Sequence, residues 1–258
     1  MARYKVILTY DGTHFQGYQR QGPVRTVQAE METALRGLGW QGKTVLSSGR
    51  TDSGVHAAGQ VVAFDLDWSH SEEALARALN ANLPADAAVR EVSRAADDFH
   101  PRFDAVERRY QYRLIFTPFR DPLRERYAWR IWPALTVDQL QMAAGLLQGS
   151  HDFAAFGTPP VPGGSTIRYI YSADWAAEGD EWRFTIRGNA FLYHMVRRLV
   201  FVQVQVGQNR LSLEEIQASL RDARPLPPGL APAQGLTLME VRYVENRQEA
   251  VRLIKTLL

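Results

Sequence analysis

The first 95 residues follow a hydrophobic pattern that few folds can accommodate. Residues 3–10 place an apolar side chain at every second position, which is the period of a half-buried strand. Further strands are expected at 43–48, 60–66 and 87–94. One helix is expected from the Thr26 cap to Gly39, and a second from the capping pattern Ser69-x-x-Glu72. The resulting order, β-α-β-β-α-β, is the ferredoxin-like order.

The rest of the chain repeats this order with one added strand and one added helix. Strands are expected at 103–117, 127–132, 166–177, 182–188 and 235–244. Helices are expected after the caps Thr136 and Ser212, at 190–206 behind an Asn189 cap, and over the last twelve residues from Asn246. We interpret this as a weak repeat of architecture rather than of sequence.

The repeat predicts an α+β fold of two ferredoxin-like halves, residues 1–103 and 104–258. Joined edge to edge, they would form one mixed, mostly antiparallel sheet with helices on one face. The other face would stay open to a ligand such as RNA. Residues 149–165 have no regular pattern and end in a Pro-Gly-rich run, so a mobile loop is expected there.

The composition limits the class of protein. The chain has no cysteine, which excludes disulfides, thiolate catalysis and cysteine–zinc sites. It has no apolar run of about 18 residues and no signal-peptide pattern before its first strand, so we expect a cytoplasmic protein. Only three of its 30 basic residues are lysine. Arginine suits phosphate and base-edge contacts, although a GC-rich genome produces the same bias.

Chemistry-bearing residues concentrate in the run Ser48–Ala57, between two expected strands. Asp52 stands there between Gly49 and Gly54, two residues from Arg50. Glycines allow positive φ and a close approach of the backbone to a ligand. A neighbouring guanidinium favours the ionised carboxylate, which suits a nucleophile or a charge stabiliser. An Asx turn held by a salt bridge would have the same spacing.

A second polar stretch, residues 14–25, mixes aromatic and basic side chains. Rings stack on bases and guanidinium groups hold phosphates, so this composition suits distorted or single-stranded RNA. An ordinary long connection is the alternative interpretation.

The run Gly49-Arg50-Thr51-Asp52-Ser53-Gly54-Val55-His56-Ala57 resembles the signature of the tRNA pseudouridine synthase A family. Seven further segments match that family in order, at residues 10–12, 17–21, 80–84, 98–103, 108–112, 189–197 and 234–236. The departures are small. Ser53 stands where alanine is commoner, Tyr18 where tryptophan is commoner, and Gln234 replaces an acidic residue.

The resemblance implies an isomerase that converts uridine to pseudouridine at positions 38, 39 and 40 of the tRNA anticodon stem-loop. The N1–C1′ bond breaks and the uracil is reattached through C5. The base must first be flipped, because its C5 edge and sugar are inaccessible in a stacked stem. No redox step is involved, so no cofactor is expected. The partners expected are tRNA and a second copy of the chain, with no membrane.

The resemblance also assigns roles to five residues. Asp52 is the expected catalytic carboxylate, either attacking C1′ or stabilising charge there. Tyr110 is expected to stack on the target uracil and is a candidate base for the C5 proton, while Tyr112 is the better core candidate. Arg197 is the expected salt-bridge partner of Asp52. Arg50 is expected to take the place of the flipped uridine, and Leu236 to line the uracil pocket.

Two alternatives remain at this point. One is a pseudouridine synthase for another RNA. The other is a non-catalytic RNA-binding module of two ferredoxin-like halves. Such a module has no use for a glycine-flanked aspartate in a cleft, and standard RNP-type aromatic motifs are not found.

Overall fold

The computed structural model describes residues 1–244. Two compact units divide this part of the chain, one made of Met1–Ala105 with residues 237–244, the other of Val106–Leu236. The boundary lies two residues from the expected division at 103/104. The C-terminal helix expected from Asn246 lies outside the described residues. Among residues 1–244, no helix has both the length and the apolarity that a membrane crossing requires.

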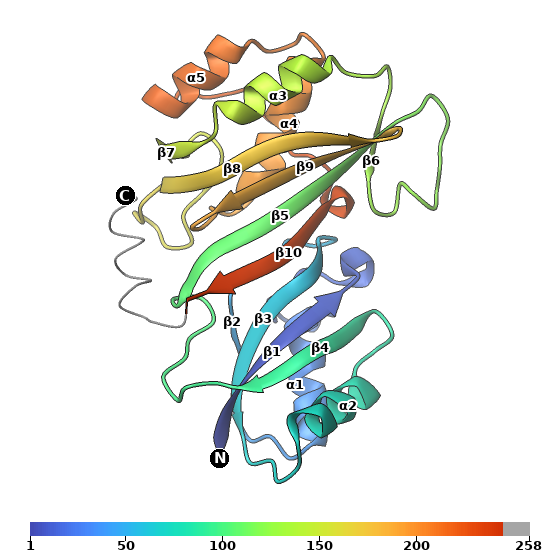
Figure 1. Cartoon of the computed structure of the whole chain (residues 1–258), viewed down its shortest axis with the longest axis vertical. Helices are drawn as coiled ribbons and strands as arrows, with labels where there is room; N and C mark the ends of the chain where they lie inside the picture. The colour runs from blue at the N-terminus through green and yellow to red at the C-terminus, as the bar shows by residue number, and fades with distance from the viewer. Residues whose placement is uncertain (245–258) are drawn as a thin grey trace. The chain divides into compact units, whose positions relative to one another are not determined.

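The first unit is built on a mixed sheet with the strand order β4-β1-β3-β10. Its strands are β1 (Ala2–Tyr10), β2 (Leu46–Ser47), β3 (His56–Leu66), β4 (Ala87–Arg94) and β10 (Leu236–Tyr243). β1 pairs antiparallel with β3 and β4, and the short β2 pairs antiparallel with β3 (Figure 1). β10 pairs parallel with the start of β3, where Thr237 opposes His56.

Helices α1 (Val27–Gly37) and α2 (Glu72–Asn82) pack together, and α2 lies against β4. A short 3-10 helix, η1 (Gly12–His14), follows β1. The alternate residues Tyr4, Val6, Leu8 and Tyr10 of β1 are all buried, as their period predicts. Thr26 caps α1 by accepting from the Ala29 N–H, and Gly39 follows that helix at φ +87°.

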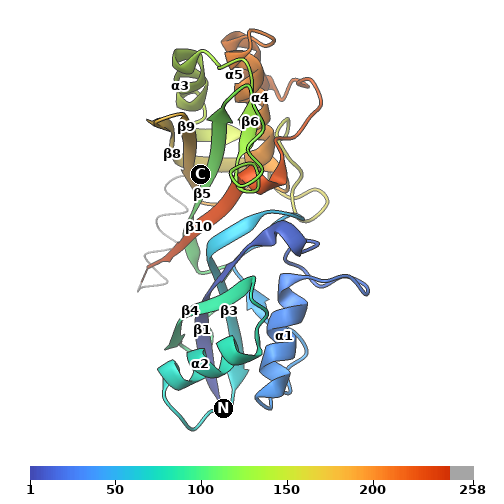
Figure 2. The same ribbon diagram turned by 90° about the vertical axis from the view of Figure 1, so that its right-hand side faces the viewer.

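The second unit contains an antiparallel sheet in the order β5-β9-β8-β7. Its strands are β5 (Ala105–Phe116), β6 (Trp129–Ile131), β7 (Gly149–Asp152), β8 (Ile167–Glu178) and β9 (Glu181–Gly188), with β6 parallel to the end of β5. Three α-helices complete it, α3 (Val137–Gly145), α4 (Met195–Gly207) and α5 (Leu213–Asp222), beside the 3-10 helix η2 (Ala233–Gly235). α3 packs on α4, α5 and β8 (Figure 2). The α+β class is thus confirmed.

Several local expectations are wrong. Ser71, not Ser69, caps α2, because its Oγ accepts from the Ala74 N–H at 3.2 Å. Thr136 does precede α3, but its side chain makes no capping hydrogen bond. The run 149–165 is not wholly irregular, since it begins with β7.

The helix expected at 190–206 begins only at Met195, five residues late. Asn189 does not cap it. The Asn189 Oδ1 instead accepts from the backbone N–H groups of Tyr169 and Ala190, at 3.0 and 2.7 Å, and so braces the end of β9 against β8. The capping box of α5, by contrast, is confirmed, with Ser212 and Glu215 bonding each other's backbone N–H groups.

Candidate active site

Asp52 lies on the loop that joins β2 to β3, as its flanking strand patterns predict. The Val55 N–H donates to the Asp52 carbonyl oxygen at 3.1 Å, which closes a tight turn. Gly54 sits in this turn at φ +78°, a conformation that favours glycine. The Asp52 side chain is half-buried, so it is positioned yet reachable.

The Asp52 loop is held by hydrogen bonds to the segment that follows β1. The Tyr18 N–H donates to the Thr51 carbonyl oxygen at 3.0 Å, and the Gly54 N–H donates to that of Phe15 at 3.3 Å. The hydroxyls of Tyr10 and Thr51 lie 2.8 Å apart and share a hydrogen bond. Burial raises the pKa of Tyr10 to about 12, so this hydroxyl stays protonated at neutral pH. Asp52 therefore follows a residue held through both its backbone and its side chain.

Two glycines outside the signature permit this close packing. A Cβ on Gly12 would lie 2.0 Å from the Val55 carbonyl oxygen, and one on Gly17 would lie 2.9 Å from that of Thr51. Gly49, inside the signature, behaves differently. It has no positive φ, and a Cβ there would meet nothing within 4 Å. The expectation of positive φ is thus confirmed for Gly54 and wrong for Gly49.

Gln60 braces the entry to the loop, a role that the sequence did not reveal. Its side chain is fully buried in β3. Its Nε2 donates to the Gly49 carbonyl oxygen at 3.1 Å, and its Oε1 accepts from the Ser48 hydroxyl at 2.6 Å. An amide in the largely apolar run 57–64 was the available signal, because buried polar groups need partners.

The Arg50 side chain forms no hydrogen bond to this scaffold in the described part of the chain. Its side chain is exposed, and it forms no ion pair within residues 1–244. His56, in contrast, is buried, and its Nδ1 accepts from the Gly12 N–H at 3.0 Å. The signature therefore contains a structural histidine and an arginine available to a ligand.

In the second unit, Tyr110 and Tyr112 follow one another on the same face of β5 but differ in burial. Tyr112 is fully buried, and its hydroxyl donates to the Pro232 carbonyl oxygen at 2.7 Å. Burial raises the pKa of Tyr112 well above its usual value, against the opposing effect of Arg197. Tyr110 is only half-buried and meets the ring of Phe191 edge to face, with centroids 5.2 Å apart. Tyr112 is confirmed as the core residue of the two.

Arg197 and Arg198 lie in the first turn of α4 and both bind the chain between α5 and η2. The Arg197 Nε donates to the Ala231 carbonyl oxygen at 2.8 Å. Arg198 donates to the carbonyl oxygens of Leu226 and Gly229, both at 2.9 Å. Arg198 is the more buried of the two, and burial lowers its pKa. The Arg198 guanidinium thus donates to two backbone carbonyl oxygens. Arg197 is half-buried, and the hydrogen bond from its Nε fixes its orientation.

Leu236 begins β10 directly after η2 and is buried. Gly235 before it is required by packing, since a Cβ there would lie 2.5 Å from the Tyr112 ring. The Tyr112 ring thus packs against the turn that directly precedes Leu236.

The predicted site residues are divided between the units. Arg50 and Asp52 belong to the first unit, and Tyr110, Arg197 and Leu236 to the second. The ion pair expected between Asp52 and Arg197 joins the two and stays a prediction. Within residues 1–244, no cluster of three or more carboxylate or imidazole side chains could hold a metal ion.

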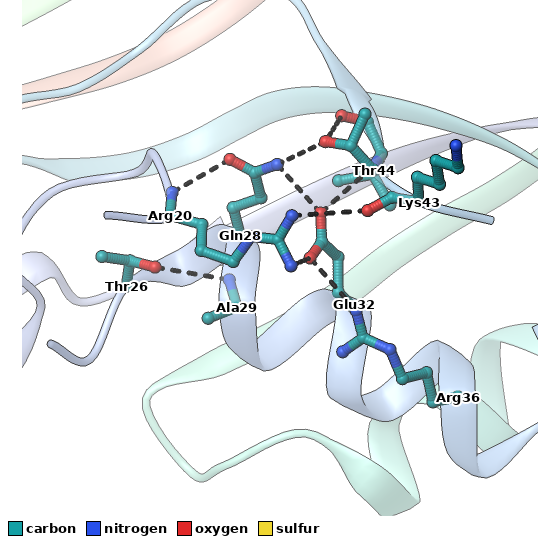
Figure 3. A network of polar contacts seen from close by, with 9 residues as sticks. Arg20, Thr26, Gln28, Ala29, Glu32, Arg36, Lys43 and Thr44 are labelled. Carbon is teal, nitrogen blue, oxygen red and sulfur yellow. Dashed lines mark hydrogen bonds and ion pairs between the residues drawn. The ribbon is translucent and has the colours of Figure 1, made fainter. Parts of the chain in front are cut away.

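The loop at 14–25 does not offer its rings to a ligand, contrary to expectation. Phe15 and Tyr18 are buried in the core. Arg25 forms a two-pronged ion pair with Asp86, at 2.7 and 2.8 Å. Arg20 reaches the fully buried carboxylate of Glu32 at 3.1 Å (Figure 3). A buried carboxylate needs such partners, so these residues are committed to the fold.

Glu32 is the centre of this network, as Figure 3 shows. Arg36, one helical turn on, approaches its second oxygen at 3.5 Å. The Glu32 Oε1 accepts from the side chain of Gln28 at 2.9 Å and from the Val45 N–H at 3.3 Å. The network ties α1 to the loop before it and to the strand region after it.

Comparison with known proteins supplies the family. The family model described as tRNA pseudouridine synthase matches residues 6–104 and 143–244. A protein named tRNA pseudouridine synthase A from Geobacter sp. (strain M21) is 41% identical over 248 residues, which cover 95% of this chain and 100% of the relative.

Two more relatives carry the same name. The one from Lactiplantibacillus plantarum is 39% identical over 254 residues, covering 96% of this chain and 97% of its own. The one from Geobacillus kaustophilus is 42% identical over 248 residues, covering 95% of each. The chain belongs to the tRNA pseudouridine synthase family, and the resemblance found in its motifs is confirmed.

Proposed function

We propose that this protein is an isomerase that converts uridine to pseudouridine in tRNA. The observation that carries the proposal is the match to the family over both halves of the chain, with relatives about 40% identical along nearly their whole length. The reaction breaks the N1–C1′ bond, forms a C5–C1′ bond, releases the C5 proton and leaves a proton on N1. Nothing is oxidised, and atoms are conserved between uridine and product apart from exchange of protons with water.

Asp52 is the residue we assign to C1′. Its carboxylate either bonds to C1′ or stabilises the positive charge that develops there when N1 leaves. Its place on a turn fixed by Thr51 and Gly54 supports the assignment, because a positioned group needs little reorganisation during reaction.

Tyr110 is assigned to the reacting uracil, and Arg197 is assigned to the Asp52 carboxylate. The half-buried ring of Tyr110 is suited to stacking on uracil, and its hydroxyl is our candidate for moving the C5 proton. Arg197 is oriented by the hydrogen bond from its Nε to the Ala231 carbonyl oxygen, and we assign its guanidinium to an ion pair with Asp52.

Arg50 and Leu236 are assigned to substrate binding. The exposed guanidinium of Arg50 is suited to fill the space that the flipped uridine leaves in the RNA. Leu236 is proposed to line the uracil pocket with its apolar side chain. By family resemblance we assign the target to positions 38, 39 and 40 of the anticodon stem-loop.

We also propose a homodimer that acts in the cytoplasm without a cofactor. The exposed ring of Trp132 supports the dimer, because an aromatic surface of this kind is commonly covered by a partner. Light scattering in dilute solution that detects only the monomer would refute it.

The variant Asp52→Asn tests the function. It is nearly isosteric and removes both the charge and the nucleophilic oxygen, so tritium release from tRNA labelled at uridine C5 should fall below detection. Filter binding of tRNA should persist, because affinity comes mainly from cations on phosphates. Ser53→Ala in the same loop is the matched control and should stay active. Turnover by Asp52→Asn would refute its role.

The position of the target can be tested with the same assay. A tRNA with cytidine at 38, 39 and 40 should release no tritium, while restoring uridine at one of the three should restore release. Undiminished release from the cytidine-substituted tRNA would move the target elsewhere.

A further inference from the structure

His194, at the start of α4, has a backbone conformation that is uncommon for residues other than glycine. Its φ is +65° and its ψ −3°, the left-handed region that favours glycine. Its side chain makes no capping hydrogen bond to the helix. A glycine would adopt this turn with less strain, so the turn itself does not require an imidazole.

The ring of His194 is stacked on that of Tyr193. Their centroids are 3.7 Å apart and their planes 32° apart. The Tyr193 side chain is 54% exposed, whereas the rings of Phe153, Phe156 and Phe184 in the same unit are buried. The two residues therefore present an aromatic surface to solvent at a point where the chain is strained.

The backbone under this surface is rigidly held. The Tyr193 N–H donates to the Thr158 carbonyl oxygen at 2.9 Å, and the Thr158 N–H donates back to the Tyr193 carbonyl oxygen at 3.3 Å. Gly157 allows this contact, since a Cβ there would lie 2.7 Å from the Tyr193 carbonyl oxygen. The exposed ring thus stands on a fixed base, which lowers the entropy lost when a ligand binds it.

The segment that carries this surface also contacts Tyr110 and contains Arg197. Phe191, two residues before Tyr193, contacts the ring of Tyr110. Arg197 follows His194 by three residues in the first turn of α4. The stacked pair therefore belongs to the same short segment that contacts Tyr110 and supplies Arg197.

We propose that the stacked pair Tyr193–His194 is a platform for an unpaired base of the tRNA beside the target uridine. Exposed rings stack on nucleobases of any sequence, and unpaired bases can be splayed out onto them. For a target at position 39, the base concerned is its loop-side neighbour at 38. The proposal rests on the proposed function and adds residues that bind substrate without touching the reacting atoms.

The test uses tRNA with its single target uridine at position 39 and 2-aminopurine at 38, whose fluorescence is quenched by stacking. Quenching on binding should be strong with the unaltered protein and largely lost with Tyr193→Leu. Tyr193→Phe, which keeps the ring face, should restore it. Tyr193→Leu should also raise KM about 10-fold while kcat changes little. His194→Gly, which keeps the turn but removes the second ring, should change quenching and KM in the same direction.

Phe119→Leu is the matched control, because Phe119 is 79% exposed in the same unit but far along the chain from this segment. It should leave quenching and KM unchanged. Unchanged quenching and KM in Tyr193→Leu would overturn the platform. Loss of dimer in light scattering, with unchanged quenching, would assign the surface to a second copy and also overturn it. Absence of tritium release from the unaltered protein would instead refute the proposed function, while the quenching measurement would still decide the platform.

Discussion

Two segments of this protein combine aromatic and charged side chains, and the structure uses them in opposite ways. In the loop 14–25, Phe15 and Tyr18 are buried and both arginines are held by carboxylates. In the segment Asn189–Arg197, Tyr193 is exposed on a backbone held by Thr158.

The comparison teaches that composition does not identify a binding surface. Rings become available to RNA only where the fold leaves them exposed, as it does for Tyr193 and not for Phe15 and Tyr18. Glu32 on the following helix and Asp86, which is distant in sequence from the first loop, decide its role. Variants of the two segments should therefore separate into those that change catalysis or binding and those that change stability.

The largest effect is expected for Tyr110→Phe, beside the second segment. It keeps the ring that meets Phe191 but removes the hydroxyl, so turnover should fall about 100-fold or more while tRNA binding persists. Tyr112→Phe is the control. It leaves the Pro232 carbonyl oxygen without its donor and should lower the free energy of unfolding by about 1 kcal/mol. Single-turnover tritium release and urea titration measure the two effects, and equal turnover in both variants would contradict the role of Tyr110.

In the first loop, Arg20→Ala should lower the free energy of unfolding by about 2 kcal/mol, because it removes one of two cations from the buried Glu32. The salt dependence of tRNA affinity should not change. Arg50→Ala should instead reduce the salt dependence of tRNA affinity, by about one phosphate contact, without destabilising the protein. If Arg20→Ala weakened RNA binding as Arg50→Ala does, the distinction between committed and available arginines would fail.

In the second segment, His194→Gly should have a free energy of unfolding about 1 kcal/mol higher than that of His194→Ala, because glycine adopts positive φ without strain. Thermal or urea unfolding of the two variants measures the difference. A glycine variant that is no more stable than the alanine variant would contradict backbone strain at this position.

The smallest effect concerns pH and the first loop. The pKa of Asp86 is lowered by hydrogen bonds from Arg25, so Asp86 is ionised at a lower pH in the folded than in the unfolded chain. As the pH falls below about 4, the unfolded chain therefore binds a proton at Asp86 more readily than the folded chain does. The stability that the Arg25–Asp86 pair contributes is lost as the pH falls through the pKa of Asp86 in the folded chain. Arg25→Gln should make the loss of stability below pH 4 less steep. Asp86→Asn should likewise make the free energy of unfolding depend less on pH below pH 4. An unchanged pH dependence in both variants would contradict the ion pair's contribution.

Local features of the fold were predictable because their causes lie within a few residues. The period of β1, the Thr26 cap and the Ser212–Glu215 capping box all follow from neighbouring side chains. Gly54 could likewise be predicted, since the turn that it completes spans only residues 52–55. The five candidate site residues came from motif resemblance, which also needs no coordinates.

Errors arose where a distant partner competed with a local signal. Asn189 has the chemistry of a helix cap, but the N–H of Tyr169 on another strand takes its oxygen. The helix α4 instead begins at Met195, after the turn at His194. The brace from Gln60 to Gly49 was missed for the same reason, because a side chain's use depends on which backbone groups the fold leaves unpaired.

The sequence by itself determined the family, the α+β class and the residues proposed for catalysis, because these are written in motifs and in short-range periodicity. Only the tertiary structure decided which rings and arginines are available to a ligand. Burial and ion pairing depend on residues far apart in the chain, such as Arg25 with Asp86 or Tyr193 with Thr158. Folding alone brings such pairs together, so no local pattern can reveal them.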